Sequence, residues 1–445
     1  MKKILLFILA CMAIPLQAQE SPKTYSFSLD QAISHALTNN YSAINADRDI
    51  AMARKKKWET TAMGLPQIGA GLDYQNNFEL QKSLIPAEFF GGQPGQFAEI
   101  AFGTKHNMNA RTSWSQIIFD GSYLVALQAS KTYLKYYENA KKNTAVSVRE
   151  MVINTYGNVL LAEEGLLILK KNKATLEKTL FETNEIFKNG LIEEENVEQL
   201  QITLSTVNSS LAYTERLLEI ARKMLKITLG MELTDNLTLT DKLDQLSVAN
   251  LDLAFAQNEF KMDNNTNYQI AKNFTEQRQL ELKLEKSKAL PSLYASVNFG
   301  YNAFNNQFAF FTQNQRWMNY SNLGMSLQVP IFSSLMRTAR TQQARIAVDK
   351  ANTQLKETTQ KLQLQFEKAK SEYEFSVEEY TTAKNNLLLA ERIEKKQEIK
   401  FGEGLSSSFE FNEAQRQLYT AQQNYLQSMV NIINKKAALA AVLNN

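Results

Sequence analysis

Residues 65–78 read LPQIGAGLDYQNNF and residues 290–304 read LPSLYASVNFGYNAF, so one pattern occurs twice at an offset of 225. After each Leu-Pro pair, apolar and polar side chains alternate, and a period of two is typical of a β-strand. The polar positions are rich in Gly, Asn, Ser and Gln. Each segment therefore predicts a strand with one apolar face and one polar face.

Further anchors recur in the same order along the chain. The pair Asn39-Asn40 precedes the first Leu-Pro by the same distance as Asn264-Asn265 precedes the second. The sequence FKNGL at 187–191 returns as FGEGL at 401–405, at an offset of 214. Such ordered self-similarity indicates an internal duplication. The first copy carries an insertion, and the Pro- and Gly-containing segment 82–106 is expected to be an exposed loop.

Two more segments, 107–119 and 320–332, alternate in the same way and predict a second strand in each copy. An ordinary soluble sheet packed on helices is the alternative to a membrane sheet. The export signal described below and the lack of regular strand-helix alternation favour the membrane sheet, whose polar face would line water.

Long helices are predicted between and after the strands. Residues 121–189 contain no proline, and a helix of that length is on the order of 100 Å long. Many of its three-four-spaced positions are small or polar, which suits helices packed side by side around a wide cylinder better than a coiled-coil dimer. Ser28 and Gln31 have the spacing of a capping box, and Gly230 stands where a helix C-cap is expected.

Composition excludes several classes of protein. The chain has 445 residues and a formal net charge of +3, which argues against a nucleic acid or other polyanion as partner. It has one cysteine and two histidines, so a disulfide framework is excluded and no metal-ligand spacing occurs. We find no Ser-His-Asp arrangement or phosphate-binding glycine loop either, so we expect no enzyme activity and no cofactor.

The N-terminus has the organisation of a signal peptide over 1–18. Lys2 and Lys3 precede an apolar run, and Ala18 provides a small residue before a cleavage point. An alternative is a lipobox ending at Cys11, which would make that cysteine a lipidated N-terminus. The lengths of the regions favour ordinary secretion.

The boundaries of the expected organisation follow from these patterns. A first repeat spans 28–230, a linker spans 231–251, and a second repeat spans 252–445. The first repeat contains a helix over 28–63, strands over 65–78 and 107–119, and a helical hairpin over 121–229. The second contains a helix over 252–289, strands over 291–304 and 320–332, and a hairpin over 335–443. Four strands cannot close a membrane barrel, and open edges are not tolerated in lipid, so the chain must oligomerise if these strands span a membrane.

At this point the sequence resembles the TolC family of outer-membrane efflux proteins. SLDQAISHALTNN resembles the family's opening helix, the two Leu-Pro segments its first strands, and VPIFSS the end of its second-repeat return strand. GLIEEENVEQLQ and GLSSSFEFNEAQRQLYTAQQNYL resemble its two helix-turn-helix tips. The resemblance covers residues 28–443. One departure is that residues 117–120 lack a proline equivalent to Pro330.

The resemblance implies a mainly α-helical fold with a membrane β-barrel, twelve-stranded in a homotrimer, above a periplasmic helical tunnel. It implies an outer-membrane location in a Gram-negative bacterium, and partners in a periplasmic adaptor and an inner-membrane pump. The implied function is the channel of a tripartite efflux pump that exports small molecules. Alternatives are the channel of a type I protein secretion system and, more remotely, a periplasmic coiled-coil adaptor or structural protein.

Three groups of residues are candidate sites. Leu191 and Leu405 follow the turn glycines Gly190 and Gly404; each leucine either packs on its own hairpin or, as the resemblance implies, docks an adaptor. Glu410 and Glu413 share a helix face, and the resemblance implies a cation-selective ring at the periplasmic entrance. The alternative is that both are only first-turn acids that stabilise a helix N-terminus. Five residues on the polar faces of the predicted strands are expected to line the lumen, namely Asp73, Gln75, Arg111, Asn298 and Gln328. The run 193–195, three glutamates, predicts the first turn of a helix in preference to a metal site.

Overall fold

A computed structural model describes residues 23–444 of the chain. The predicted signal peptide at 1–18, including Cys11, lies outside the described residues. The chain divides into two compact units, and each unit combines segments of both predicted repeats. Unit 1 comprises the chain up to Asp47, Ala140–Tyr268 and Thr359–Asn445; unit 2 comprises Arg48–Asn139 and Gln269–Thr358.

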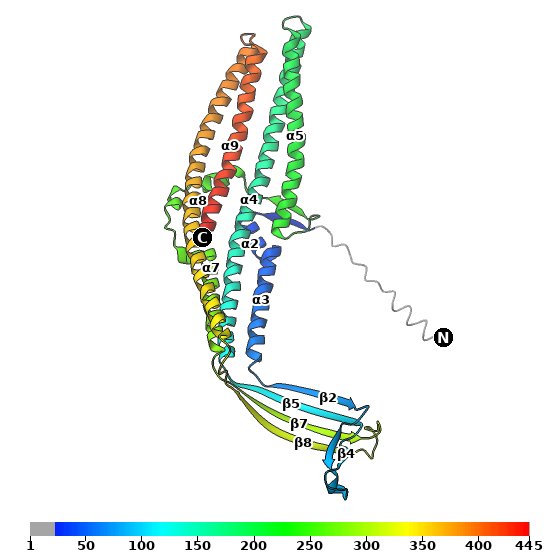
Figure 1. The fold of residues 1–445 in the computed structure, drawn as a ribbon. Helices are drawn as coiled ribbons and strands as arrows, with labels where there is room; N and C mark the ends of the chain where they lie inside the picture. Colours follow the sequence, from blue (N-terminus) through cyan, green and yellow to red (C-terminus); the bar gives the residue numbers. More distant parts are fainter. Residues whose placement is uncertain (1–22, 445) are drawn as a thin grey trace, which may run out of the picture. The chain divides into compact units, whose positions relative to one another are not determined.

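Unit 2 contains an antiparallel sheet of four strands in the order β2-β5-β7-β8 (Figure 1). The predicted strands of both copies are therefore confirmed, and they meet where β5 pairs with β7. The sheet is open, with β2 and β8 at its edges. Its strands are β2 Gln67–Asn76, β5 His106–Asp120, β7 Ser292–Asn305 and β8 Trp317–Gln328.

The register places the polar positions of all four strands on one face and the apolar positions on the other. Ile68, Trp114, Val297 and Leu323 form one row across the apolar face. In the single chain this face is uncovered: Ile68 is 76% exposed and Leu323 is 71% exposed.

Two predictions about this unit are wrong in detail. The strand expected over 320–332 begins earlier and ends at Gln328, because Pro330 has no N–H group to continue the ladder. The segment 82–106 is not all loop. Its strands β3, Lys82–Pro86, and β4, Phe97–Ala101, form a hairpin around the 3₁₀ helix Ala87–Phe90.

Unit 1 contains the tips of two long helical hairpins. The first hairpin consists of α4, Gly121–Lys188, and α5, Glu194–Leu229. The second consists of α8, Met336–Gly402, and α9, Ser408–Leu443. Apolar side chains of all four helices enter one core, which includes Tyr156, Leu225, Tyr380 and Ile433. None of the helices among residues 23–444 is long and apolar enough to cross a bilayer.

The opening helix expected over 28–63 is two helices, α2 Leu29–Asn39 and α3 Tyr41–Ala62. The Ser28–Gln31 capping box of α2 is confirmed. Asn40 breaks the helix with an extended backbone, φ −60° and ψ 136°. Its side chain accepts a hydrogen bond from the Ser42 N–H at 2.8 Å, so it serves as the N-cap of α3.

The second repeat has the same junction. Here the helix expected over 252–289 is shorter, because α7 spans Thr266–Ser287 and two 3₁₀ helices, Leu253–Gln257 and Met262–Asn264, precede it. Asn265 accepts from the Asn267 N–H at 3.0 Å and caps α7. The amide of Asn40 donates to the carbonyl of Thr228 at 2.7 Å, and that of Asn265 donates to the carbonyl of Val442 at 2.9 Å. The duplicated asparagines therefore join equivalent helix ends in both copies.

Residues 231–251, expected as a linker, contain regular structure as well. Strand β6, Asn236–Leu239, pairs in parallel with β1, Thr24–Phe27, and α6 follows at Leu243–Ala249. Sequence reasoning missed β1 and β6 because a four-residue strand is too short to show a clear alternation.

Candidate functional site

Each helical hairpin ends in a glycine turn of the same geometry. Gly190 has φ +72° and Gly404 has φ +73°, a backbone conformation that side-chain-bearing residues rarely adopt. The Leu191 N–H donates to the Ile186 carbonyl, and the Leu405 N–H donates to the Lys400 carbonyl. Both turns are therefore Schellman motifs, as the Gly-Leu pattern indicates.

The leucine after each glycine is uncovered in the single chain. Leu191 is 75% exposed and Leu405 is 73% exposed. A Schellman motif usually pairs this side chain with the residue five positions earlier. For Leu405 that residue is Lys400, which offers a flexible charged chain instead of an apolar surface. For Leu191 it is the apolar Ile186, but the exposed fractions show that both leucine side chains remain largely uncovered.

Glu410 belongs to the capping box that starts α9. The Glu410 N–H donates to Ser407 Oγ at 3.3 Å, and the Ser407 N–H donates back to Glu410 Oε2 at 3.1 Å. Ser406 Oγ donates to the same carboxylate at 2.8 Å. These bonds, that from Ser406 first, hold the pKa of Glu410 below its ordinary value. Glu410 therefore stabilises the N-terminus of α9, and its side chain remains exposed.

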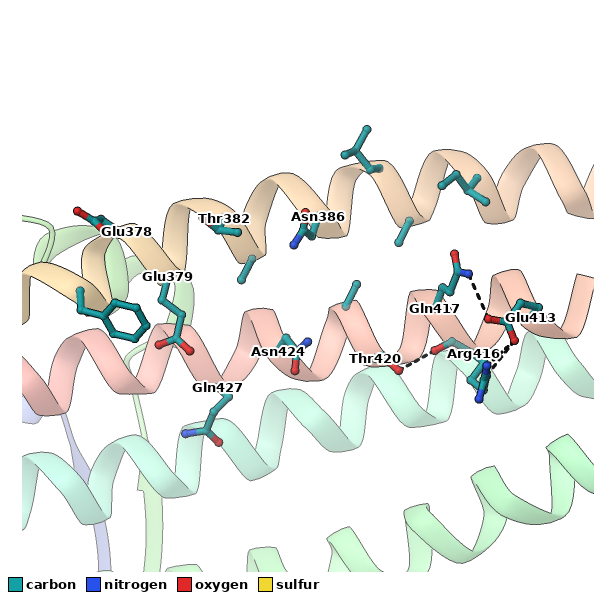
Figure 2. Close-up of a pocket in the computed structure, with 16 residues that line it drawn as sticks. Glu378, Glu379, Thr382, Asn386, Glu413, Arg416, Gln417, Thr420, Asn424 and Gln427 are labelled. Atoms are coloured by element: carbon teal, nitrogen blue, oxygen red, sulfur yellow. Dashed lines mark hydrogen bonds and ion pairs between the residues drawn. The ribbon is translucent and has the colours of Figure 1, made fainter. Parts of the chain in front are cut away.

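Glu413 lies one turn further along α9 and is paired with Arg416, as Figure 2 shows. Arg416 donates from Nη2 at 2.6 Å and from Nε at 3.0 Å to Glu413 Oε2. Gln417 donates to Oε1 at 3.2 Å. The bond from Gln417 and then those from Arg416 hold the pKa of Glu413 below its ordinary value.

Sequence reasoning missed Arg416, although its spacing of three from Glu413 signals a pair on one helix face. With Arg416 present, two carboxylates and one guanidinium leave a single negative charge per chain at this place on α9. The like-charge repulsion expected in a ring would raise the pKa of a carboxyl group. Within one chain, the local hydrogen bonds act in the opposite direction.

The five polar-face residues predicted from the sequence share one face of the sheet. Asp73 Oδ2 lies 3.5 Å from Arg111 Nη2. Asn298 donates to Asn322 Oδ1 at 3.0 Å, and Gln75 donates to Asn77 Oδ1 at 2.8 Å. The fifth, Gln328, ends β8, where it pairs with Ser292. The set is spread along the whole length of the strands, so it forms a surface and not a compact site.

Residues 262–445, which are 184 of the 445 residues, match the family model described as outer membrane efflux protein. This segment of the chain is therefore similar to that family. The chain matches none of the curated proteins compared with it.

Several solved structures share the fold of this chain over nearly its whole length. CusC, whose crystal structures are described in connection with folding and transmembrane channel formation, is 15% identical to this chain. The match covers 96% of this chain and 95% of CusC, with a TM-score of 0.74. The MtrE outer membrane channel of Neisseria gonorrhoeae is 16% identical, with coverages of 94% and 89% and a TM-score of 0.73. The CmeC outer membrane channel of Campylobacter jejuni is 16% identical, with coverages of 96% and 90% and a TM-score of 0.72. At these identities the likeness establishes the fold.

A groove of about 860 Å³ runs between α8 and α9. Figure 2 shows Glu413 and Arg416 near one end and the acidic pair Glu378 and Glu379 near the other. Asn386 and further amides lie between them. Sequence analysis did not find this groove, because its walls come from two helices whose facing sides depend on hairpin packing.

The acidic run at 193–195 lies at the start of α5. Glu193 is the N-cap residue, without a side-chain capping bond, and Glu194 and Glu195 occupy the first turn. Carboxylates in this place complement the positive end of the helix dipole. In the part of the chain that the structure describes, no three His, Cys, Asp or Glu side chains gather as a metal site.

Proposed function

We propose that this protein is the outer-membrane channel of a tripartite efflux pump. In this role it passes small molecules outward while an inner-membrane pump supplies the energy. The observation that carries the proposal is the open sheet of unit 2, which has an exposed apolar face, a polar face and two unpaired edges. The match of residues 262–445 to the outer membrane efflux protein family model supports the same function.

The open edges argue for a trimer. In lipid every backbone N–H and C=O group needs a partner, so the free edges of β2 and β8 must pair with other chains. Three copies would give a twelve-stranded barrel, within the range of closed membrane barrels. The proposed location is the outer membrane of a Gram-negative bacterium, with the helical hairpins in the periplasm.

Three measurements test this function. Detergent-solubilised protein should have about three times the chain mass after correction for bound detergent, and planar bilayers containing it should conduct. A cell lacking the protein should accumulate small molecules that the wild type expels. A soluble monomer would refute the architecture, and loss of a secreted protein without any accumulation would instead favour type I secretion.

The exposed leucines of the two tips are proposed to dock the periplasmic adaptor. An apolar side chain on an exposed turn is favourable only when a partner covers it. Leu191→Glu combined with Leu405→Glu should abolish export and leave the trimer and its membrane insertion intact. Leu84→Glu, which changes a leucine of similar exposure in β3, is the matched control. Normal export by the double variant would exclude docking through these side chains.

Glu410 and Glu413 are proposed to ring the periplasmic entrance and favour cations. Glu410→Gln tests the role of the charge more specifically than Glu410→Ala does, because glutamine at this position of a capping box keeps the hydrogen bonds and removes only the charge. Glu410→Gln with Glu413→Gln should weaken cation preference and abolish block by a trivalent cation. Arg416→Gln should act in the opposite direction, because it releases the charge of Glu413. Unchanged selectivity in both variants would show that these residues only stabilise the helix.

A further inference from the structure

The polar face of the sheet holds one isolated ion pair. The sequence places only three Asp, Glu, Lys or Arg residues in the four strands of unit 2, namely Asp73, Arg111 and Asp120. Asp120 is the last residue of β5 and caps the start of α4, where its Oδ1 accepts from the Ser122 N–H at 2.7 Å. Asp73 and Arg111 are therefore the only opposite charges within the body of the sheet.

The register gives Arg111 a glycine on each side. Arg111 is paired with Gly71 on β2 and with Gly300 on β7. A Cβ atom on Gly71 would lie 3.5 Å from Arg111 Nε, so the arginine side chain lies across this glycine. Its Nη2 reaches Asp73 Oδ2, two residues further along β2, at 3.5 Å. The missing side chain of Gly71 thus makes room for the pair.

The pair is one end of a polar belt, which we define as Asp73, Arg111, Asn109, Asn302 and Tyr320. Asn109 donates to the Tyr320 hydroxyl at 3.2 Å and also to Asn302. The Tyr320 ring lies over Gly300, where a Cβ atom would approach its ring carbons to 2.8 Å. The belt therefore crosses all four strands at one level of the sheet.

The ion pair contributes little to folding stability. The side chains of Asp73 and Arg111 are 62% and 58% exposed, and solvent-exposed ion pairs are screened by water and salt. What the pair does control is the local charge of the polar face. Without Asp73 the body of the sheet would carry one positive charge, and without Arg111 it would carry one negative charge.

We propose that Asp73 and Arg111 determine the charge selectivity of the sheet segment of the pore. The Arg111 guanidinium is the group that would bind anionic solutes such as carboxylates and phosphates, and Asp73 keeps it neutralised. This inference rests on the proposed function, in which three copies place the polar face around a lumen. Each belt then contributes one compensated pair to a ring of three.

Bilayer recordings of the full-length protein test the inference through the permeability ratio of K⁺ to Cl⁻. All variants carry Glu410→Gln, which removes the uncompensated charge at this tip and leaves Glu413 neutralised by Arg416, so that the tip does not set the ratio. Asp73→Asn should shift the ratio toward Cl⁻ and Arg111→Gln toward K⁺, each by about twofold or more at 0.1 M salt, where the Debye length is about 10 Å. Both shifts should shrink in 1 M salt, where it is about 3 Å.

Exchanging the two charges controls for changes in the ratio that come from altered structure and not from altered charge. The double variant Asp73→Arg/Arg111→Asp restores one pair per chain and should return the ratio to that of the parent. Opposite shifts in the single variants together with this return support the inference. Equal ratios in parent and single variants, in channels that conduct, overturn it and leave the proposed function standing.

A pair of cysteine variants separates failure of the inference from failure of the proposed function. Arg111→Cys and Thr112→Cys are neighbours on opposite faces of β5, and Cys11 is replaced by Ser in both. A positively charged thiol reagent added to the pore should change the conductance of Arg111→Cys and leave Thr112→Cys unchanged. The reverse result, or the absence of any trimeric channel, would overturn the lumen assignment and with it both proposals. This readout also serves if the single charge variants fail to assemble.

Discussion

Gly230, at the end of α5, is the glycine whose substitution should cost this fold most. It has φ +72°, and a Cβ atom there would lie 2.0 Å from the Asn39 carbonyl oxygen and 2.6 Å from its carbon. Gly190 and Gly404 share the same φ but have no atom within 4 Å of such a Cβ. The three glycines therefore separate the cost of backbone conformation from the cost of a steric clash.

The magnitudes follow from these two terms. Placing alanine in the left-handed region costs about 1–2 kcal/mol, and this is the whole expected cost of Gly190→Ala or Gly404→Ala. Gly230→Ala adds an overlap with backbone that no side-chain rotation can relieve, which costs about another 1–3 kcal/mol. We expect Gly230→Ala to lower the apparent melting temperature clearly more than either tip variant.

Circular dichroism of the detergent-solubilised protein, heated at one fixed rate, measures this difference. A fixed rate is needed because large membrane assemblies unfold irreversibly. If Gly230→Ala melts together with Gly404→Ala, the close approach of Asn39 to the end of α5 is wrong.

A second substitution at Gly230 tests the likeness of the two repeats. The corresponding position in the second copy is Asn444, which also has a left-handed backbone, φ +65°. Its side-chain amide donates to the Asn264 carbonyl at 2.8 Å, and Asn264 corresponds to Asn39 in the first copy. Gly230→Asn should be less harmful than Gly230→Ala, because both meet the same Cβ overlap with Asn39 but asparagine adopts the left-handed backbone at lower cost. The same melting experiment ranks the two variants, and equal losses would contradict the equivalence.

Two further predictions concern helix ends. Asn40→Ala and Asn265→Ala should each destabilise the protein by about 1–3 kcal/mol and by similar amounts, because each removes a helix cap and leaves a carbonyl unpaired; a marked difference in melting temperature between them would contradict their equivalence. The pKa of Glu410 lies below its ordinary value of 4.5, so its stabilising contribution is present above that value and is lost as the pH falls below it. The melting temperature of Glu410→Gln should therefore lie below that of the wild type at pH 7, and the difference should shrink as the pH is lowered below 4.5, whereas a constant difference would show that the charge is irrelevant.

Features with a local cause were predictable from the sequence. The strand alternation and the Gly-Leu turns each depend on residues a few positions apart, and the structure confirms the four strands and both left-handed glycines. The duplication was visible for the same reason, since each copy keeps its own local pattern. The Ser28 capping box also needs only two residues three positions apart.

Features with a distant cause were missed. The break at Asn40 depends on the carbonyl of Thr228, which lies 188 positions away, and a single asparagine inside an otherwise helical pattern costs too little to predict a break. The pairing of β1 with β6 joins segments 212 residues apart that are each only four residues long. The groove between α8 and α9 likewise depends on how two helices face one another.

Glu410 shows how a structural role and a proposed functional role can share one side chain. Its Oε2 atom accepts from Ser406 and Ser407, which fixes the carboxylate at the start of α9, and the pKa lowered by these bonds keeps it charged at neutral pH. A capping box therefore supplies what an entrance ring requires, namely a carboxylate of fixed position and constant charge. Glu413 differs, because Arg416 compensates its charge. If the ring exists, Glu410→Gln alone should remove its net negative charge and with it the cation preference, and adding Glu413→Gln should shift selectivity toward anions, because it leaves Arg416 uncompensated.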